Sequence, residues 1–199
     1  MKSHFSRPKA IEPDFLLMAY GRGYFPMADP KSREIHWYSP DPRAIFDLKA
    51  FHIPRSLSLT VKKRPFEIKI DNAFESVMRQ CGEREETWIS EELVQSYVTL
   101  HRLGFAHSVE CWRENGLVGG LYGVSIAGAF FGESMFSVEK DTSKVALVHL
   151  VDRLRERAFE LLDTQFLTTH LARFGAKEIP RKEYLTKLEK ALKKNCIFA

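Results

Sequence analysis

The sequence predicts an α+β fold, in which a small N-terminal domain precedes a larger domain built on a mixed β-sheet. Two observations carry this prediction. Seven of the nine prolines lie within residues 1–60, where they disfavour long helices. After that region, patterns with the two-residue period of β-strands are followed by a helical pattern and one further strand, an order typical of α+β domains.

The N-terminal region, residues 1–60, combines these prolines with many aromatic side chains, among them Trp37 and Phe46. Aromatic residues in this number are not typical of disordered chains. One short helix is expected at Pro13–Arg22. We therefore predict a small compact domain of short strands and turns, with its boundary near Ser58–Pro65 and the second domain over residues 61–199.

The second domain is predicted to begin with a strand and two helices. Phe66–Ile70 alternates apolar and polar residues, as a half-buried strand does. Asn72–Gln80 and Glu91–Leu103 have helical patterns, and Gly104 provides a C-terminal stop for the second helix.

The middle of this domain has the pattern of antiparallel strands. His107–Trp112 and Leu117–Val124 are predicted strands joined through a turn at Asn115-Gly116, and Ala129–Phe136 follows as a third. The glycine-dense segment Gly119–Gly123 does not match a phosphate-binding loop, so we expect it to allow close packing of strands.

The last part of the chain predicts two helices and a strand. Asp141–Ser143 offers N-cap candidates for a helix whose apolar stripe runs from Leu147 to Ala158. Leu161–Gln165 is expected to be a buried strand, and Lys182–Lys194 an amphipathic helix.

The composition limits the class of protein. The chain has 199 residues, of which 44% are hydrophobic and 28% charged, as in soluble globular proteins. No stretch approaches the roughly 18 to 20 apolar residues of a membrane span. The segment Met1–Pro8 is basic but lacks a following apolar stretch, so a secretory signal is not expected. The three cysteines have no metal-type spacing, which predicts a reducing, cytoplasmic location without disulfides or a metal site.

Clusters of basic residues stand out against a modest net charge of +4. One cluster comprises Arg55, Lys62, Lys63 and Arg64. Such clusters can bind the phosphates of a nucleic acid. They can equally be solvated helix faces, so charge alone permits an RNA partner without requiring one.

Glu133 lies in the segment from Phe130 to Ser137, between aromatic, sulfur-containing and small residues. A carboxylate is rarely placed in such surroundings unless its charge is partnered or used. It could bind the ammonium group of a substrate, or it could form a structural ion pair with a basic side chain.

Asp163 and Gln165 interrupt the apolar run from Phe159 to Leu167. Two residues apart on a strand, their side chains are expected to point to the same face. An acid beside an amide could orient an amine and stabilise an oxyanion. A buried structural hydrogen-bond pair is the alternative. We expect both side chains to face the same cavity as Glu133.

A set of motifs in the sequence resembles those of the leucyl/phenylalanyl-tRNA–protein transferase family. The set covers about Gly21 to Leu188 in the order found in that family, and its members are Tyr24-Phe25-Pro26-Met27, Trp37 to Arg43, Thr87-Trp88-Ile89, Ala106 to Glu110, Gly119 to Val124, Phe131 to Ser137, Asp163-Thr164-Gln165 and Leu171 to Arg181.

The resemblance implies a reaction and a fold. Members transfer Leu or Phe, and less readily Met, from aminoacyl-tRNA to proteins that begin with Arg or Lys. The product carries a new peptide bond and an N-degron. The implied fold is a small N-terminal α/β domain followed by a catalytic domain of the acetyltransferase (GNAT) type. An aminoacyl ester is already activated, so no cofactor or metal is implied.

The resemblance also implies roles for particular residues. Gln165 would contact the attacking amine, with Asp163 polarising it, and Glu133 would hold an ammonium group or a hydroxyl of the terminal adenosine. Trp37 and Trp88 correspond to tryptophans near that adenosine. The basic cluster from Arg55 to Arg64 would contact tRNA phosphates. Candidates for the apolar side-chain pocket are Phe130, Gly132, Met135, Leu121 and Leu150.

The alternatives at this stage are an acetyl-CoA-dependent N-acetyltransferase, a peptidoglycan-type aminoacyl ligase that uses the same donor, and a non-catalytic tRNA-binding module. The first requires a glycine-rich cradle for pyrophosphate, which the segment from Gln165 to Gly175 does not provide. Tyr38, Thr164, Leu121 and Leu150 depart from the residues usual in the family, which leaves the preference between Leu and Phe open.

Overall fold

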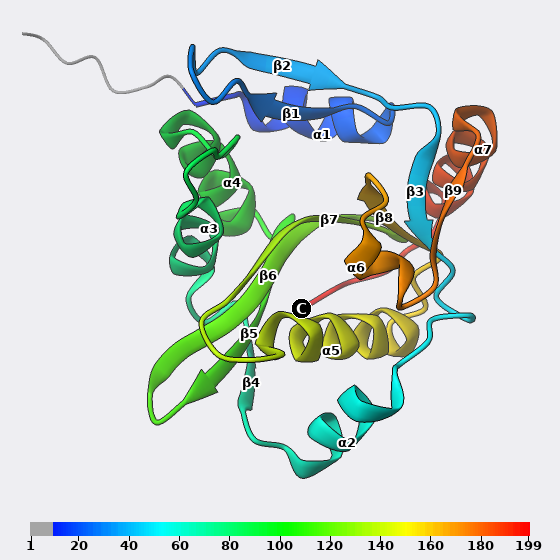
Figure 1. Ribbon diagram of the computed structural model, residues 1–199. Helices are drawn as coiled ribbons and strands as arrows, with labels where there is room; N and C mark the ends of the chain where they lie inside the picture. The colour runs from blue at the N-terminus through cyan, green and yellow to red at the C-terminus, as the bar shows by residue number, and fades with distance from the viewer. Residues whose placement is uncertain (1–9) are drawn as a thin grey trace, which may run out of the picture.

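The computed structural model describes residues 10–199, in which the chain forms two β-sheets and seven helices (Figure 1). The segment Met1–Pro8 lies outside the described residues. The strands are β1 (Phe25–Ala28), β2 (Ile35–Tyr38), β3 (Arg43–Phe46), β4 (Glu67–Ile70), β5 (Ala106–Arg113), β6 (Gly116–Ile126), β7 (Ala129–Ser137), β8 (Leu161–Gln165) and β9 (Ala176–Ile179). The helices are α1 (Pro13–Gly21), α2 (Arg55–Lys63), α3 (Phe74–Gly82), α4 (Glu91–Arg102), α5 (Thr142–Glu156), α6 (Thr169–Ala172) and α7 (Arg181–Leu192). Within residues 10–199, no helix has the length and apolar character needed to cross a membrane.

The predicted α+β class with a mixed sheet is confirmed. The large sheet has seven strands in the order β4-β5-β6-β7-β8-β3-β9, and β1 and β2 form a separate antiparallel pair. Every neighbouring pair in the large sheet is antiparallel except β7 and β8, which are parallel. The helix α5 makes the crossover between these two parallel strands, as such a connection requires.

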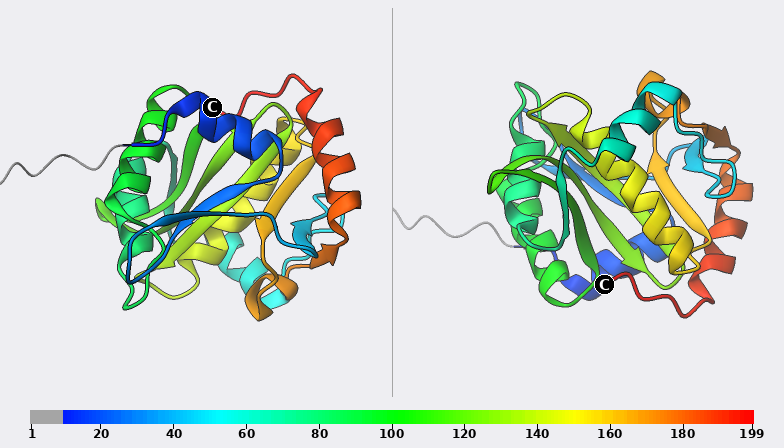
Figure 2. Two further views of the ribbon diagram at one scale, coloured as in Figure 1. Left: turned by 90° about the horizontal axis from the view of Figure 1, so that it is seen from above. Right: turned by 90° about the horizontal axis from the view of Figure 1, so that it is seen from below.

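Helices cover both faces of the large sheet (Figure 2). One view shows α1 and the β1–β2 pair on one face, with α3 and α4 beside them. The opposite view shows α5 on the other face, with α2 packed on it. Because side chains of a strand alternate between faces, neighbouring residues enter different cores. Tyr122 belongs to the core beneath α1, α3 and α4, whereas Leu121 belongs to the core beneath α5.

The predicted turns and close strand contacts are present. The β5–β6 hairpin turns at Glu114 and Asn115, which both have positive φ, one residue before the expected Asn115-Gly116, since Gly116 already pairs with Arg113. Ala127 at φ 52° helps to close the β6–β7 turn. A Cβ atom on Gly119 would lie 2.1 Å from the Thr142 hydroxyl, so only glycine lets α5 begin this close to β6.

The structure places a helix at the segment where a domain boundary is expected, Ser58–Pro65. Residues 55–63 form α2, which packs against α5. In addition, β3 pairs with β8 and β9 inside the large sheet, although it lies within residues 1–60. The side chains of β3 are all buried, so the strand lacks the alternation that reveals a strand in sequence. The division of the chain at residue 60 stays a prediction.

Candidate active site

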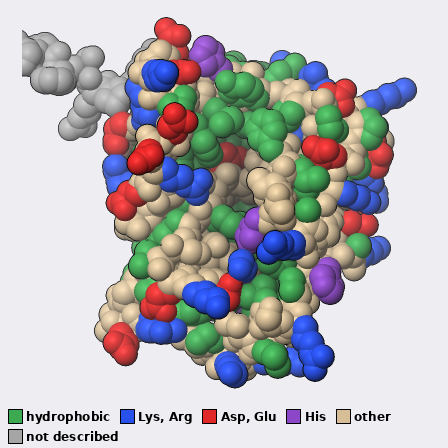
Figure 3. All heavy atoms as spheres, in the orientation of Figure 1, with side chains coloured by type: hydrophobic (Ala, Val, Ile, Leu, Met, Phe, Trp, Pro, Cys, Tyr) green, Lys and Arg blue, Asp and Glu red, His purple; other side chains and the backbone are tan. Residues whose placement is uncertain are grey.

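A cavity of about 280 Å³ lies where β7 and β8 separate. The two strands pair only over residues 129–131 and 161–163, and β7 then continues without β8. Figure 3 shows a hollow in this face of the molecule, with hydrophobic side chains above it and basic side chains around it. The apolar part of the cavity wall consists of Leu121, Met135, Leu147, Leu150, Leu162, Phe166 and Leu171. Its polar part includes Glu133, Gln165 and Arg84.

Two irregularities in strand pairing determine where the polar side chains of the cavity point. In β7, Tyr122 pairs with Ser134 and Gly123 with Gly132, so Glu133 is an extra residue without a partner on β6. In β8, the pairing with β3 likewise passes over Thr164. Such bulges redirect side chains and are frequent beside active sites. Gln165 follows the second bulge with φ 59°, a backbone conformation uncommon outside glycine.

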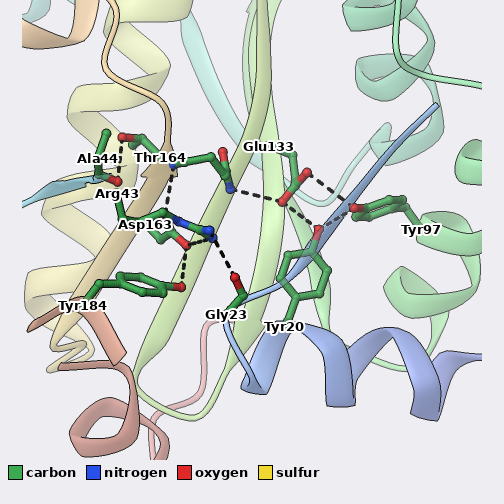
Figure 4. Close-up of polar contacts among 10 residues, drawn as sticks. Tyr20, Gly23, Arg43, Ala44, Tyr97, Glu133, Asp163, Thr164 and Tyr184 are labelled. Carbon is green, nitrogen blue, oxygen red and sulfur yellow. Dashed lines mark hydrogen bonds and ion pairs between the residues drawn. The ribbon is translucent and has the colours of Figure 1, made fainter. Parts of the chain in front are cut away.

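Neutral donors surround the carboxyl group of Glu133 (Figure 4). Tyr20 of α1 donates a hydrogen bond to Oε1 at 2.7 Å, and Tyr97 of α4 donates to Oε2 at 3.4 Å. The two tyrosine hydroxyls are also hydrogen-bonded to each other, and each hydroxyl has only one proton. When Tyr20 donates to Glu133, the Tyr97 proton is therefore shared between the Tyr20 hydroxyl and Oε2. Gln165 Nε2 donates to Oε1 at 3.4 Å, which joins the carboxyl group to the amide that is expected to face the same cavity.

The pKa of Glu133 is raised from its ordinary value of 4.5 to about 8. Burial is the largest cause, and the charge of Asp163 acts in the same direction. Hydrogen bonds from Tyr20 and Tyr97 and the charge of Arg43 lower the pKa but do not offset burial. At neutral pH the protonated form of Glu133 therefore predominates in the free protein.

Asp163 is sealed behind the cavity in a different environment. Its carboxylate accepts two hydrogen bonds from the guanidinium of Arg43, from Nε at 2.9 Å and from Nη2 at 2.6 Å. Both side chains are at most 1% exposed. The hydroxyl of Tyr184 donates to Oδ2 at 2.8 Å, and the backbone N–H of Gln165 donates to Oδ1 at 2.9 Å. Asp163 thus holds the uncommon backbone conformation of Gln165 from behind.

The expected shared cavity is therefore found for two of the three polar residues. Glu133 and Gln165 line it, whereas Asp163 does not. The alternation rule fails here because the bulge at Thr164 and the positive φ of Gln165 end the regular strand. Asp163 contacts Gln165 through the backbone N–H of Gln165. In this arrangement Asp163 would act on a substrate in the cavity through Gln165 rather than by direct contact.

The five residues predicted to form the apolar pocket divide in a similar way. Gly132, Met135, Leu121 and Leu150 line the cavity. Phe130 does not, which corrects that prediction. It is fully buried under α5, and its ring packs against Phe198 at a centroid distance of 5.1 Å. Phe130 lies in the part of β7 that is still paired with β8, before the two strands separate to open the cavity.

The two tryptophans lie outside the cavity wall and are half-buried. Trp37 is on β2, where its ring meets Phe15 edge-on at 5.3 Å. Trp88 is in the segment between α3 and α4, and its carbonyl oxygen accepts a hydrogen bond from Ala28 of β1 at 3.0 Å. Neither indole is enclosed, so both retain surface for a ligand.

The four basic residues predicted to contact tRNA come together on one element. Arg55, Lys62 and Lys63 lie on α2, and Arg64 is its C-cap. All four side chains are exposed. None of them forms an ion pair in the described part of the chain.

Several residues of the site were missed from sequence. Tyr20 and Tyr97 have the helical spacing of core residues, and Tyr184 likewise lies in an amphipathic helix pattern. Arg43 was noted only as part of a motif, although it is fully buried. Its partner Asp163 is 120 residues away, a separation that no local pattern reveals. Among residues 10–199, no cluster of three or more His, Cys, Asp or Glu side chains is arranged to hold a metal ion.

The α+β fold thus has a mixed sheet and an apolar cavity between two diverging strands, which ends at a carboxyl–amide pair. The family model described as "Leucyl/phenylalanyl-tRNA protein transferase" matches residues 45–189, and the model for the N-terminal domain of that family matches residues 9–41. The chain belongs to this family.

Curated relatives agree with the family models. The leucyl/phenylalanyl-tRNA–protein transferase of Gloeobacter violaceus is 52% identical over 94% of this chain and 97% of the relative. That of Herpetosiphon aurantiacus is 53% identical over 96% of this chain and 99% of the relative. Among solved structures, L-PGS from Bacillus licheniformis is similar with a TM-score of 0.42 and 15% identity, over 91% of this chain and 63% of that one.

Proposed function

We propose that this protein transfers Leu or Phe, and less readily Met, from aminoacyl-tRNA to the α-amine of proteins that begin with Arg or Lys, and so creates an N-degron in the cytoplasm. The observation that carries the proposal is the apolar cavity that ends at Glu133 and Gln165. The aminoacyl side chain would fill the apolar part, which places the ester at the polar end.

The transfer step requires an amine, an ester and a route for one proton. The amine nitrogen attacks the ester carbonyl carbon, the new C–N bond forms, and the C–O bond to the terminal ribose breaks. The proton lost by the amine ends on the ribose oxygen. Since the ester is already activated, alignment and electrostatic stabilisation are the main requirements.

Glu133 and Gln165 are suited to that proton route. An α-amine has an ordinary pKa of about 7.7–8.0. The pKa of Glu133 is about 8, so a proton can pass between the two groups at little cost in free energy. Because Gln165 directs its Nε2 toward Glu133, its carbonyl oxygen remains free to accept a hydrogen bond from the attacking amine.

The experiment that tests the function combines radiolabelled Leu-tRNA with peptides that begin with Arg or Ala. Label should appear in the Arg peptide alone, without acetyl-CoA, ATP or an added metal. Gln165→Ala should lower transfer about 100-fold, as loss of one positioning or oxyanion-stabilising group does. Label in both peptides would contradict the acceptor specificity, and label in neither would contradict the function.

The basic helix α2 supports the tRNA part of the proposal. Its four exposed cations would contact phosphates of the tRNA backbone, and Trp37 and Trp88 would contact the terminal adenosine. Lys62→Ala combined with Lys63→Ala should weaken tRNA binding and reduce the dependence of log K on log salt by about 0.7–0.9 for each phosphate that is no longer neutralised. The matched control is Lys187→Ala with Lys190→Ala on α7. An equal change in slope for both pairs would exclude a specific role for α2.

A further inference from the structure

Arg84 is a cation on the wall of the cavity that the proposed reaction does not use. It lies between α3 and α4, and its Nη2 donates a hydrogen bond to the carbonyl oxygen of Met135 at 2.7 Å. The side chain is exposed and forms no ion pair within residues 10–199. A guanidinium has five N–H donors, so most of them stay available to a ligand.

The segment that carries Arg84 is fixed at both ends. At one end Arg84 itself donates its hydrogen bond to Met135 of β7. At the other, Arg33 donates to the carbonyl oxygens of Thr87 and Ile89, at 3.1 and 3.0 Å, and Ala28 donates to that of Trp88. The guanidinium and the indole of Trp88 are therefore held four residues apart on one braced segment beside the cavity.

The wall next to Arg84 holds a second unused donor. The hydroxyl of Tyr122 is buried and has no hydrogen-bond partner among the described residues. Tyr122 also lines the cavity. Burial raises the pKa of its hydroxyl, and the charge of Arg84 partly opposes this rise. A buried hydroxyl without a partner is rare in folded proteins, so this hydroxyl is available to a bound ligand.

Bulk charge does not explain the placement of Arg84. Glu83, Glu85 and Glu86 flank it and are exposed, so the segment as a whole is acidic. A single guanidinium in this setting can bind one anion specifically, because it can donate two parallel hydrogen bonds to two oxygens of that anion. That behaviour differs from the cluster on α2, where several cations share one helix.

We propose that Arg84 binds the 5′-phosphate of the donor's terminal adenosine, while the aminoacyl group occupies the apolar cavity and the base lies against Trp88. The inference rests on the proposed function, because it takes aminoacyl-tRNA as the donor. The proposal adds a residue that binds the nucleotide next to the ester. This contact is separate from the proposed contacts of α2 with phosphates elsewhere in the tRNA.

Two stable donor analogues test this assignment. They are 3′-phenylalanylamido-3′-deoxyadenosine and its 5′-monophosphate, used as competitive inhibitors of transfer from Phe-tRNA. For the unchanged protein, the 5′-monophosphate should inhibit with a Ki about tenfold lower, as expected for a charge-assisted pair of hydrogen bonds. Arg84→Gln should remove this difference and leave the Ki of the unphosphorylated analogue unchanged. The control variant is Arg79→Gln, since Arg79 is paired with Glu75 and Glu91 on the outer surface.

Each other outcome overturns the assignment. Equal Ki values in the unchanged protein would show that the phosphate is not bound. A Ki raised equally for both analogues in Arg84→Gln would assign Arg84 to bracing Met135 in β7. Failure of both analogues to inhibit, with transfer from Phe-tRNA intact, would place the terminal nucleotide elsewhere. Absence of transfer from Phe-tRNA itself would overturn the proposed function, and the assignment with it.

Discussion

Asp163 and Glu133 are two carboxyl groups of one site that are stabilised in opposite ways. Asp163 is 0% exposed and is satisfied by the two N–H groups of a guanidinium, a tyrosine hydroxyl and a backbone N–H. Glu133 is half-buried, opens onto the cavity, and receives hydrogen bonds only from neutral groups. The carboxylate of Asp163 therefore forms an ion pair with a cation, the guanidinium of Arg43, whereas the carboxyl group of Glu133 has no cation in contact with it.

The difference shows how one sheet can hold a fixed charge and a transferable proton side by side. A buried ion pair with every lone pair satisfied is rigid, and it suits the task of bracing Gln165. A carboxyl group that is desolvated without a cation exchanges its proton near neutral pH instead. Asp163, behind the cavity, therefore positions Gln165. Glu133, on the cavity wall, is the residue able to take part in proton transfer.

The largest effect is expected from Asp163→Asn. The substitution leaves the guanidinium of Arg43 buried without a carboxylate, which should lower the free energy of unfolding by about 3–5 kcal/mol. Urea denaturation measures this change. The control is Glu75→Gln, which breaks an exposed pair with Arg79 and should cost under about 1 kcal/mol. If both variants lose the same amount, Asp163 is not the structural anchor described above.

A pH dependence of stability is expected from Glu133. Its pKa is about 8 in the folded protein and about 4.5 in the unfolded chain, so the folded protein binds the extra proton between these values. The resulting stabilisation is complete below pH 4.5 and is lost as the pH rises through about 8. The two pKa values correspond to a loss of at most about 5 kcal/mol across this window. Because Glu133 opens onto the cavity, where solvent screens its charge, we expect a smaller loss, of about 2 kcal/mol.

Glu133→Gln isolates that contribution, because the amide keeps the shape but does not titrate. The difference in free energy of unfolding between the variant and the unchanged protein should shift in favour of the variant as the pH rises from 5 to 8.5. Denaturant titrations at several pH values provide the measurement. A difference that stays constant with pH would mean that Glu133 keeps an ordinary pKa.

Much of the fold could be predicted because its elements have regular periods. The strands β4 to β8, the presence of a hairpin turn between β5 and β6, and helix α5 follow from alternation, turn chemistry and an apolar stripe, although the turn lies one residue before the expected Asn115-Gly116. Elements without a period were missed. The strand β3 is buried on every residue, β9 is short, and α2 lies in a stretch where proline suggested irregular chain.

The candidate site divides along the same line. Glu133 and Gln165 could be found because polar residues interrupt apolar sequence. Tyr20 and Tyr97 could not, since a tyrosine at helical spacing has the same pattern as any core residue. The partnership of Arg43 with Asp163 depends on strand order, and strand order is set by packing across the whole sheet rather than by local sequence.

A smaller effect is expected from the tyrosines that contact Glu133. Both Tyr20→Phe and Tyr97→Phe remove the hydrogen bond between the two hydroxyls. Tyr20→Phe also removes the hydrogen bond of 2.7 Å to Glu133, whereas Tyr97→Phe removes only the longer one of 3.4 Å, so Tyr20→Phe should cost about 1 kcal/mol more. The Tyr20 hydrogen bond lowers the pKa of Glu133, so its loss should move the pH window of stability upward. Denaturation of both variants at pH 7 and 9 tests the order. A larger loss for Tyr97→Phe would reverse the assignment of the principal donor.

The smallest effect, and one of opposite sign, is expected from Tyr122→Phe. Tyr122 shares the core face with Tyr20 and Tyr97, but its hydroxyl has no partner among residues 10–199. Removing a buried polar group that makes no hydrogen bond relieves a desolvation cost, so the variant should be as stable as the unchanged protein or more stable by about 0.5 kcal/mol. Thermal denaturation beside Tyr20→Phe makes the comparison. A loss equal to that of Tyr20→Phe would reveal that a water or a neighbouring group satisfies the hydroxyl, and burial alone would then not distinguish the three tyrosines.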